Sequence, residues 1–300
     1  MAYDAANRFA SAGTAATAMV TAGYDTLSRV NALTRQGGAD TAVGYDDADR
    51  MASLAHSFTN SANNESWTFA YTPAGRLASE TGTNGAWDWT PPTVAALTTT
   101  ANGLNQNATV GSASWAYDAN GNLTSDGTRS FTYDAENRLL TVTATGVSLA
   151  LAYDPTGRLT QTIDSGTTIQ FVYDGDALVG EYPASGNAPL RRYVHGPAVD
   201  SPFIWYEGSG VAASNADYLL PDRQGSIVAT ASTSGAWIKT YIYDPYGVPT
   251  AWGAIGTDPR FRYTGQAALP SASLYYYKAR EYDPASGKFL QTDPVGMGRT

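Results

Sequence analysis

The chain has 300 residues, a net charge of −9 and no cysteine. The lack of cysteine excludes disulfides and thiolate chemistry, and the lack of a stripe of Lys and Arg argues against nucleic acid or an anionic membrane surface as a partner. With 20 Tyr and only 15% charged residues, the composition favours strands and turns over helices, because aromatic side chains suit a pleated surface.

The first residues contain no basic stretch followed by an apolar run, so no cleavable signal peptide is predicted. No apolar run reaches the roughly 18 residues of a membrane span. A repeated phrase already starts at the third residue. We therefore expect the chain to begin within a longer array and to be exported by a delivery system, or held at a cell surface, as part of a larger protein.

The repeated phrase has seven residues: Tyr, Asp, two variable residues, Gly or Asn, a polar or basic residue, and an apolar residue. Copies begin at Tyr3, Tyr24, Tyr45, Tyr71, Tyr117, Tyr133 and Tyr153, and a degenerate copy without the basic residue begins at Tyr173. Most copies are spaced by about 20 residues, which is too short for paired-helix repeats and fits two short strands with two turns.

Each phrase is typical of a β-hairpin. Tyr ends one strand, and the Asp carboxylate can accept a bond from the backbone N–H two residues later. Gly or Asn in the fifth place accepts a positive φ, and Arg then enters the return strand within reach of the Asp. The predicted structural turn residues include Asp118 with Gly121, Asp134 with Asn137, and Asp154 with Gly157. Seven copies cannot all be active sites, so we assign these residues to architecture.

Between the phrases, residues 66–71, 130–134 and 168–174 alternate in polarity and predict strands. Alanine-rich runs near the N-terminus occupy strand positions of the repeat, and we expect strands there too. Residues 79–111 break the rhythm and form either a long loop or, as we favour, a degenerate pair of repeats. The predicted fold is all-β: antiparallel hairpins in a curved ribbon, with an array over 1–180 and a second region over 181–300.

One stretch, "YDANGNLTSDGTRSFTYDAENRLLTV" (117–142), resembles the YD-repeat of bacterial Rhs proteins, toxin-complex C components and animal teneurins. Residues 218–237, 241–266 and 274–298 are similar to the end of the Rhs core. The resemblance implies a β-sheet ribbon wound into a hollow shell, or cocoon. In bacterial members of the family, the shell encloses a toxic C-terminal segment.

The resemblance further implies an aspartyl autoprotease. Its carboxylates would be Asp283 and Asp293, Arg280 would assist, and the cut would fall between Met297 and Gly298. Two carboxyl groups that share one proton can activate water and polarise a carbonyl. In one departure from the family's Arg-Tyr-Tyr-Asp, this chain has Glu281 after the arginine.

A structural alternative exists for Asp283, which is also the turn residue of one more phrase (282–289). There it would lie near Lys288, and only a fold-back of the chain would bring Asp293 close. Metals and cofactors are not expected, because the chain has no Cys and only His56 and His195 as histidines.

A ribbon of about 28 strands bent into a hoop would be about 40 Å across and one strand high. We therefore expect either a part of a longer shell or a tighter, filled structure. The partners expected for a shell are a toxin segment or further repeats that are not encoded here. The alternatives are a non-enzymatic surface or adhesion scaffold that binds glycan or protein, and an inert remnant.

Overall fold

The computed structural model describes residues 1–13, 17–92 and 98–294. These residues form 28 strands and five short 3₁₀ helices. Every pairing between neighbouring strands is antiparallel, and within each sheet the strands follow one another in sequence order. The all-β prediction is thus confirmed. Among the described residues, no helix has the length and apolar character needed to cross a membrane.

The strands form four sheets. The first sheet contains β1 (Ala2–Tyr3), β2 (Phe9–Gly13), β3 (Ala18–Tyr24), β4 (Val30–Arg35), β5 (Asp40–Tyr45), β6 (Met51–Ser57), β7 (Glu65–Tyr71) and β8 (Leu77–Gly82). A small sheet contains β9 (Thr99–Ala101), β10 (Asn107–Val110) and β11 (Ala113–Ser114). The last sheet contains β25 (Ala267–Leu269), β26 (Leu274–Tyr276), β27 (Glu281–Asp283) and β28 (Lys288–Phe289).

The long third sheet has thirteen strands. They are β12 (Ala116–Tyr117), β13 (Leu123–Ser125), β14 (Ser130–Tyr133), β15 (Leu139–Ala144), β16 (Val147–Tyr153), β17 (Leu159–Asp164), β18 (Thr167–Asp174), β19 (Ala177–Pro183), β20 (Arg191–His195), β21 (Pro202–Glu207), β22 (Ala216–Pro221), β23 (Ile227–Ser232) and β24 (Trp237–Thr240). The 3₁₀ helices are η1 (Ser61–Asn63), η2 (Gly85–Trp87), η3 (Ala213–Asn215), η4 (Tyr263–Gly265) and η5 (Pro270–Ala272).

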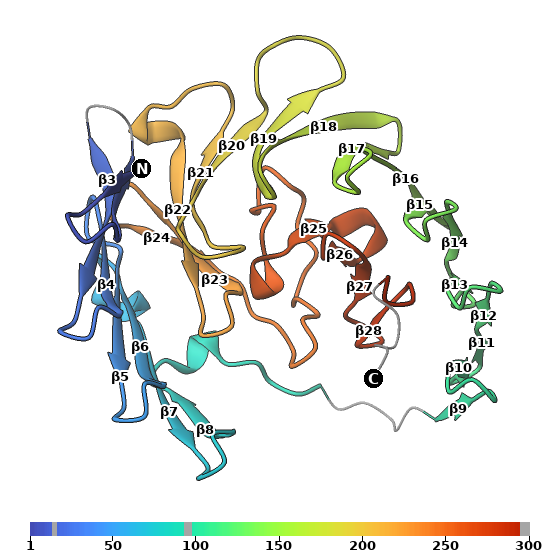
Figure 1. Cartoon of the computed structure of the whole chain (residues 1–300), viewed down its shortest axis with the longest axis horizontal. Helices are drawn as coiled ribbons and strands as arrows, with labels where there is room; N and C mark the ends of the chain where they lie inside the picture. Colours follow the sequence, from blue (N-terminus) through green and yellow to red (C-terminus); the bar gives the residue numbers. More distant parts are fainter. Residues whose placement is uncertain (14–16, 93–97, 295–300) are drawn as a thin grey trace.

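The ribbon curves around the chain's own C-terminal residues. In Figure 1 the strands run along the left, top and right of the molecule, and residues 241–294, which we name the C-terminal segment, lie inside the curve. One apolar core joins the two: Leu139, Leu149 and Leu159 of the ribbon cluster with Phe261 and Leu274 of the segment. The concavity is therefore filled by the chain itself.

A second core joins the first sheet to strands β21–β23. Phe9 packs edge-on against Phe203, with ring centroids 5.7 Å apart. The Tyr218 hydroxyl donates to the backbone carbonyl of Met19 at 3.1 Å. The imidazole of His56 lies 3.0 Å from the carbonyl of Pro221. Two stretches of ribbon far apart in sequence thus close against each other.

The repeated phrases form the predicted turns. In the first phrase, Asp4 Oδ1 accepts the N–H of Ala6 at 2.9 Å, and Asp4 and Arg8 form an ion pair at 2.7 Å. The fifth place has a positive φ even in the two copies that suit it least, Ser28 (64°) and Asp49 (60°). The local geometry predicted from the sequence is therefore confirmed at these turns.

A second rule links each repeat to the next. The next Tyr hydroxyl donates to the backbone carbonyl of the seventh-place residue, as Tyr24 does to Phe9 at 2.7 Å. The arginine in the sixth place of the preceding repeat lies on the face of that same Tyr ring. Five such stacks have guanidinium–centroid distances of 4.2–5.3 Å: Arg8 on Tyr24, Arg29 on Tyr45, Arg50 on Tyr71, Arg138 on Tyr153, and Arg158 on Tyr173. Each arginine lies between its own Asp and the next Tyr.

The described residues of the irregular region 79–111 contain one degenerate phrase. Asn102 takes the Asp place in the turn between β9 and β10, and its Oδ1 accepts the N–H groups of Leu104 and Gln106. Residues 83–92 contain η2 but no strand. The alanine-rich runs near the N-terminus contribute to β2 and β3, as expected.

Candidate functional site

The C-terminal hairpin β27–β28 positions Asp283. Asp283 pairs in register with Lys288, as its place in a repeated phrase predicts. Its side chain is buried, at 1% exposure. Oδ2 accepts a bond from Arg129 Nη2 at 2.8 Å, and Oδ1 accepts the N–H of Ala285 at 3.2 Å. Asp283 is thus fixed by an arginine from the ribbon, 154 residues away in sequence.

Arg129 connects the ribbon to this hairpin. It lies between β13 and β14, pairs with Asp126 at 2.6 Å, and donates to the carbonyl of Ala272 at 3.0 Å. Sequence reasoning did not identify it. The available signal was the turn "DGTR" (126–129), an Asp-Gly turn that ends on a basic residue.

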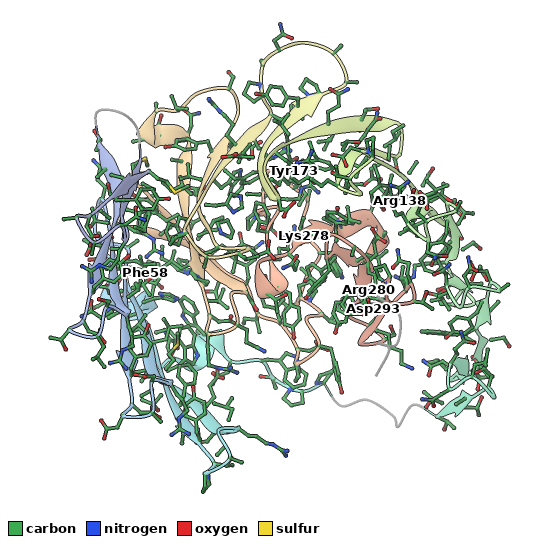
Figure 2. The ribbon with its side chains drawn as sticks, in the orientation of Figure 1. Phe58, Arg138, Tyr173, Lys278, Arg280 and Asp293 are labelled. Atoms are coloured by element: carbon green, nitrogen blue, oxygen red, sulfur yellow. The ribbon has the colours of Figure 1, made fainter. Side chains whose placement is uncertain are left out.

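Arg280 and Asp293 lie together, as Figure 2 shows. Arg280 Nη2 and Asp293 Oδ2 form an ion pair at 3.1 Å, with the carboxylate half exposed. The Arg280 guanidinium also lies 4.0 Å from the ring centroid of Phe289. The structure therefore brings together two of the three predicted catalytic residues, whereas Asp283 has a different arginine. Met297 and Gly298, the predicted cleavage site, lie outside the described residues.

Glu281, which lies between Arg280 and Asp283 in sequence, is also buried. It accepts a bond from the Tyr153 hydroxyl of β16 at 2.9 Å and contacts Gln291 Nε2, while its N–H donates to Gln291 Oε1 at 3.0 Å. Burial raises the pKa of Glu281 to about 7. The sequence marks this position as a departure from the family but gives no sign of its partners.

A cavity of about 520 Å³ lies beside Asp283. Its lining includes Asp126, Arg129, Ser271 and Ser286. The Ser271 hydroxyl is buried and has no hydrogen-bond partner among the described residues.

A second buried charge network anchors the C-terminal segment. Glu181, fully buried in β19, pairs with Arg260 through two bonds of 2.9 Å and with Arg191 at 3.1 Å. The Tyr193 hydroxyl donates to it at 2.6 Å. Burial opposes ionisation, but the two arginines outweigh it and lower the pKa of Glu181 to about 2. This network fixes where the segment lies inside the ribbon.

Comparisons with known proteins agree with this architecture. The family model described as RHS Repeat matches residues 117–148 and 133–169. The tRNA3(Ser)-specific nuclease WapA of Bacillus spizizenii is 34% identical over 197 residues, which cover 64% of this chain. The double-stranded DNA deaminase toxin A of Burkholderia cenocepacia is 29% identical over 85% of this chain. The chain spans 8% and 20% of the lengths of these two relatives.

Among solved structures, the crystal structure of TcdB2-TccC3-TEV matches with a TM-score of 0.63. The match covers 99% of this chain and 19% of that one, at 16% identity, so the likeness is one of fold. Residues 117–169 thus match RHS Repeats, and the relatives and the shared fold support the Rhs/YD-repeat family for this chain.

Proposed function

We propose that this chain is the shell and processing segment of an Rhs-type toxin-delivery protein. The observation that carries the proposal is the ribbon curved around the C-terminal segment, whose last described residues directly precede the predicted cleavage site in sequence. The named relatives, a tRNA nuclease and a DNA deaminase toxin, support a toxic segment as the partner of the shell in the longer protein.

Within this function, we propose self-cleavage between Met297 and Gly298. One carboxylate of the pair Asp283 and Asp293 accepts a proton from water, which attacks the Met297 carbonyl carbon. The other, protonated, donates its proton to the carbonyl oxygen. The C–N bond then breaks as the first carboxyl group passes the proton it took from water to the amine of Gly298. A hydroxyl of the tetrahedral intermediate returns its proton to the second carboxylate, which leaves the Met297 carboxylic acid. Arg280 would hold Asp293, and the cavity beside Asp283 would receive the peptide.

The test uses the full chain extended beyond Thr300 by a folded tag. We expect the wild type to release the tag and Asp293→Asn and Asp283→Asn to retain it. Asp47→Asn, which removes a carboxylate from an exposed turn, is the matched control and should release the tag. Retention of the tag by the wild type at neutral and mildly acidic pH would rule out processing.

The shell role has a separate test. The genomic sequence upstream of Met1 and downstream of Thr300 should encode further YD-repeats and a segment unrelated to them. If neither is adjacent, the chain does not enclose a toxic segment.

A further inference from the structure

The intact repeat junctions define a binding geometry for one chemical group. In five copies, a guanidinium lies against the turn Asp of its own repeat and on the face of the next Tyr. The ion pairs measure 2.6–2.8 Å. A planar cation satisfies both sides at once, because it pairs with a carboxylate in its plane and stacks through its face.

Two junctions of this kind have no arginine. At Asp118 the sixth place holds Asn122, whose amide donates to the Asp carboxylate at 2.8 Å, whereas the junction at Asp222 has neither an arginine nor an amide in that place. Residues 221–227 form the same turn, with the Asp222 N–H donating to the Ser226 carbonyl at 2.8 Å and Gly225 at a φ of 87°. The next Tyr is also in place, because the Tyr243 hydroxyl donates to the carbonyl of Ile227 at 2.9 Å. The sixth place, however, holds Ser226. The hydroxyl of this buried serine accepts the N–H of Thr264 at 3.0 Å.

A cavity of about 320 Å³ lies at this junction. We name it the Asp222 cavity. It is lined by the three members of the incomplete junction (Asp222, Ser226 and Tyr243), by aromatic side chains (Trp67, Trp87, Trp89, Tyr241 and Tyr263) and by further carboxylates (Glu80, Asp88 and Asp244). Its walls thus combine aromatic rings with negative charge.

Most carboxylates of the Asp222 cavity have no ion pair in the part of the chain that the structure describes. Within the described residues, Glu80 is the one member with an ion pair, to Arg223 at 3.8 Å. Asp244 is the turn residue of a second phrase whose arginine is replaced, by Val248. Two phrases that have lost their arginine therefore contribute turn carboxylates to the same cavity.

The pKa values of the turn aspartates differ between junctions with an arginine and the junction at Asp222. The N–H and guanidinium of Arg8 lower the pKa of Asp4 in an intact junction. Burial raises the pKa of Asp222 to about 6, against the lowering effect of the N–H groups of Ser226 and Gln224, and the charge of Glu80 adds to the rise. A carboxylate in this state gains more from a cation than one already paired.

We propose that the Asp222 cavity binds an arginine side chain of a partner polypeptide, with the guanidinium against Asp222 and on the ring of Tyr243. The inserted guanidinium occupies the position that the chain's own arginines hold in the intact junctions. Arginine is favoured over lysine because a guanidinium group is planar: its edge pairs with a carboxylate while its face stacks on a ring. The compact ammonium group of lysine has no such plane. Arginine is favoured over a neutral sugar because several carboxylates line the walls.

The probe is Nα-acetyl-L-arginine amide, titrated into the full chain while tryptophan fluorescence is recorded, since three of the lining residues are Trp. We expect saturable binding in the millimolar range and at least tenfold weaker binding of the citrulline analogue, which keeps the shape without the charge. Asp222→Asn keeps the acceptor oxygen of the turn and should weaken binding of the arginine probe at least tenfold. Asp47→Asn, the exposed control, should leave it unchanged.

A second variant fills the position from within. Ser226→Arg restores the intact phrase and should abolish binding of the probe. If that variant does not fold, Asp222→Asn decides. The absence of saturable binding, equal affinity for the citrulline analogue, or unchanged affinity in Asp222→Asn would overturn the proposal. A saturable response to a neutral monosaccharide that exceeds the response to the arginine probe would identify a sugar site instead.

Discussion

Two glutamates of equal burial, Glu181 and Glu281, behave in opposite ways because their neighbours differ. Both are at most 1% exposed. Glu181 faces two arginines and has a pKa of about 2, whereas Glu281 faces neutral hydrogen-bonding groups and has a pKa of about 7. For these two residues, the charge of the neighbouring side chains, and not the degree of burial, decides whether the fold favours the ionised or the protonated carboxyl group.

The first prediction concerns Glu281. Its pKa in the fold, about 7, lies above its ordinary value of 4.5, so its contribution to stability is complete below pH 4.5 and is lost as the pH rises through 7. Glu281→Gln should therefore raise the free energy of unfolding at pH 8 by up to about 3 kcal/mol and change it little at pH 4. Urea denaturation of both proteins at the two pH values measures this.

Glu181→Gln is the matched control. The same substitution there leaves Arg260 and Arg191 without their buried counter-charge and should destabilise the fold by about 3–5 kcal/mol at pH 8. If both variants shift the unfolding midpoint in the same direction at pH 8, the contrast between the two environments is wrong.

The second prediction concerns His56. Burial, together with the charge of Arg35, lowers the pKa of His56 to about 3 from an ordinary 6.5. The unfolded chain thus takes up a proton first, so the contribution of His56 to stability is complete above pH 6.5 and falls as the pH drops toward 3. An NMR titration should find the His56 ring neutral from pH 7 to pH 5. A protonation step near pH 6.5 would show that the ring is not enclosed between the first sheet and β22.

At the scale of the element, the seven-residue phrase forms its turn through local interactions. The carboxylate bonds span two and four residues, as in Asp154 to Thr156 and Arg158, and the positive φ belongs to one position. These interactions are contained within the phrase, so the sequence was sufficient to predict them. The stacking of each arginine on the next Tyr ring reaches into the following repeat, as from Arg8 to Tyr24, and was not predicted.

The third prediction concerns the fifth place of the phrase. Gly157 has a φ of 88° and open space around it, so Gly157→Ala costs only the left-handed backbone penalty, about 1–2 kcal/mol. Gly103 also has open space but no positive φ, and Gly103→Ala should change stability by less than about 0.5 kcal/mol. Thermal unfolding of the two variants measures the difference. Equal costs would mean that the turn does not require its left-handed residue.

At the scale of the whole molecule, long-range contacts decide the shape. Arg129 meets Asp283 across 154 residues, Tyr153 meets Glu281 across 128, and Glu181 meets Arg260 across 79. No local pattern encodes such contacts, which explains why the sequence predicted a curved ribbon but not what fills it. The resemblance implied Asp283, Asp293 and Arg280 as site residues, but it did not show that Asp283 would have its own arginine from the ribbon.

The central claim is that the ribbon curves around the C-terminal segment and packs against it, and the ion pair between Arg129 and Asp283 tests it most directly. A double-mutant cycle with Arg129→Met and Asp283→Asn, followed by urea unfolding, removes the separate contribution of Asp126 to Arg129. A buried pair at 2.8 Å should give a coupling free energy of at least about 1 kcal/mol. A coupling of zero within error would mean that the two residues do not meet, and the segment would not lie inside the ribbon.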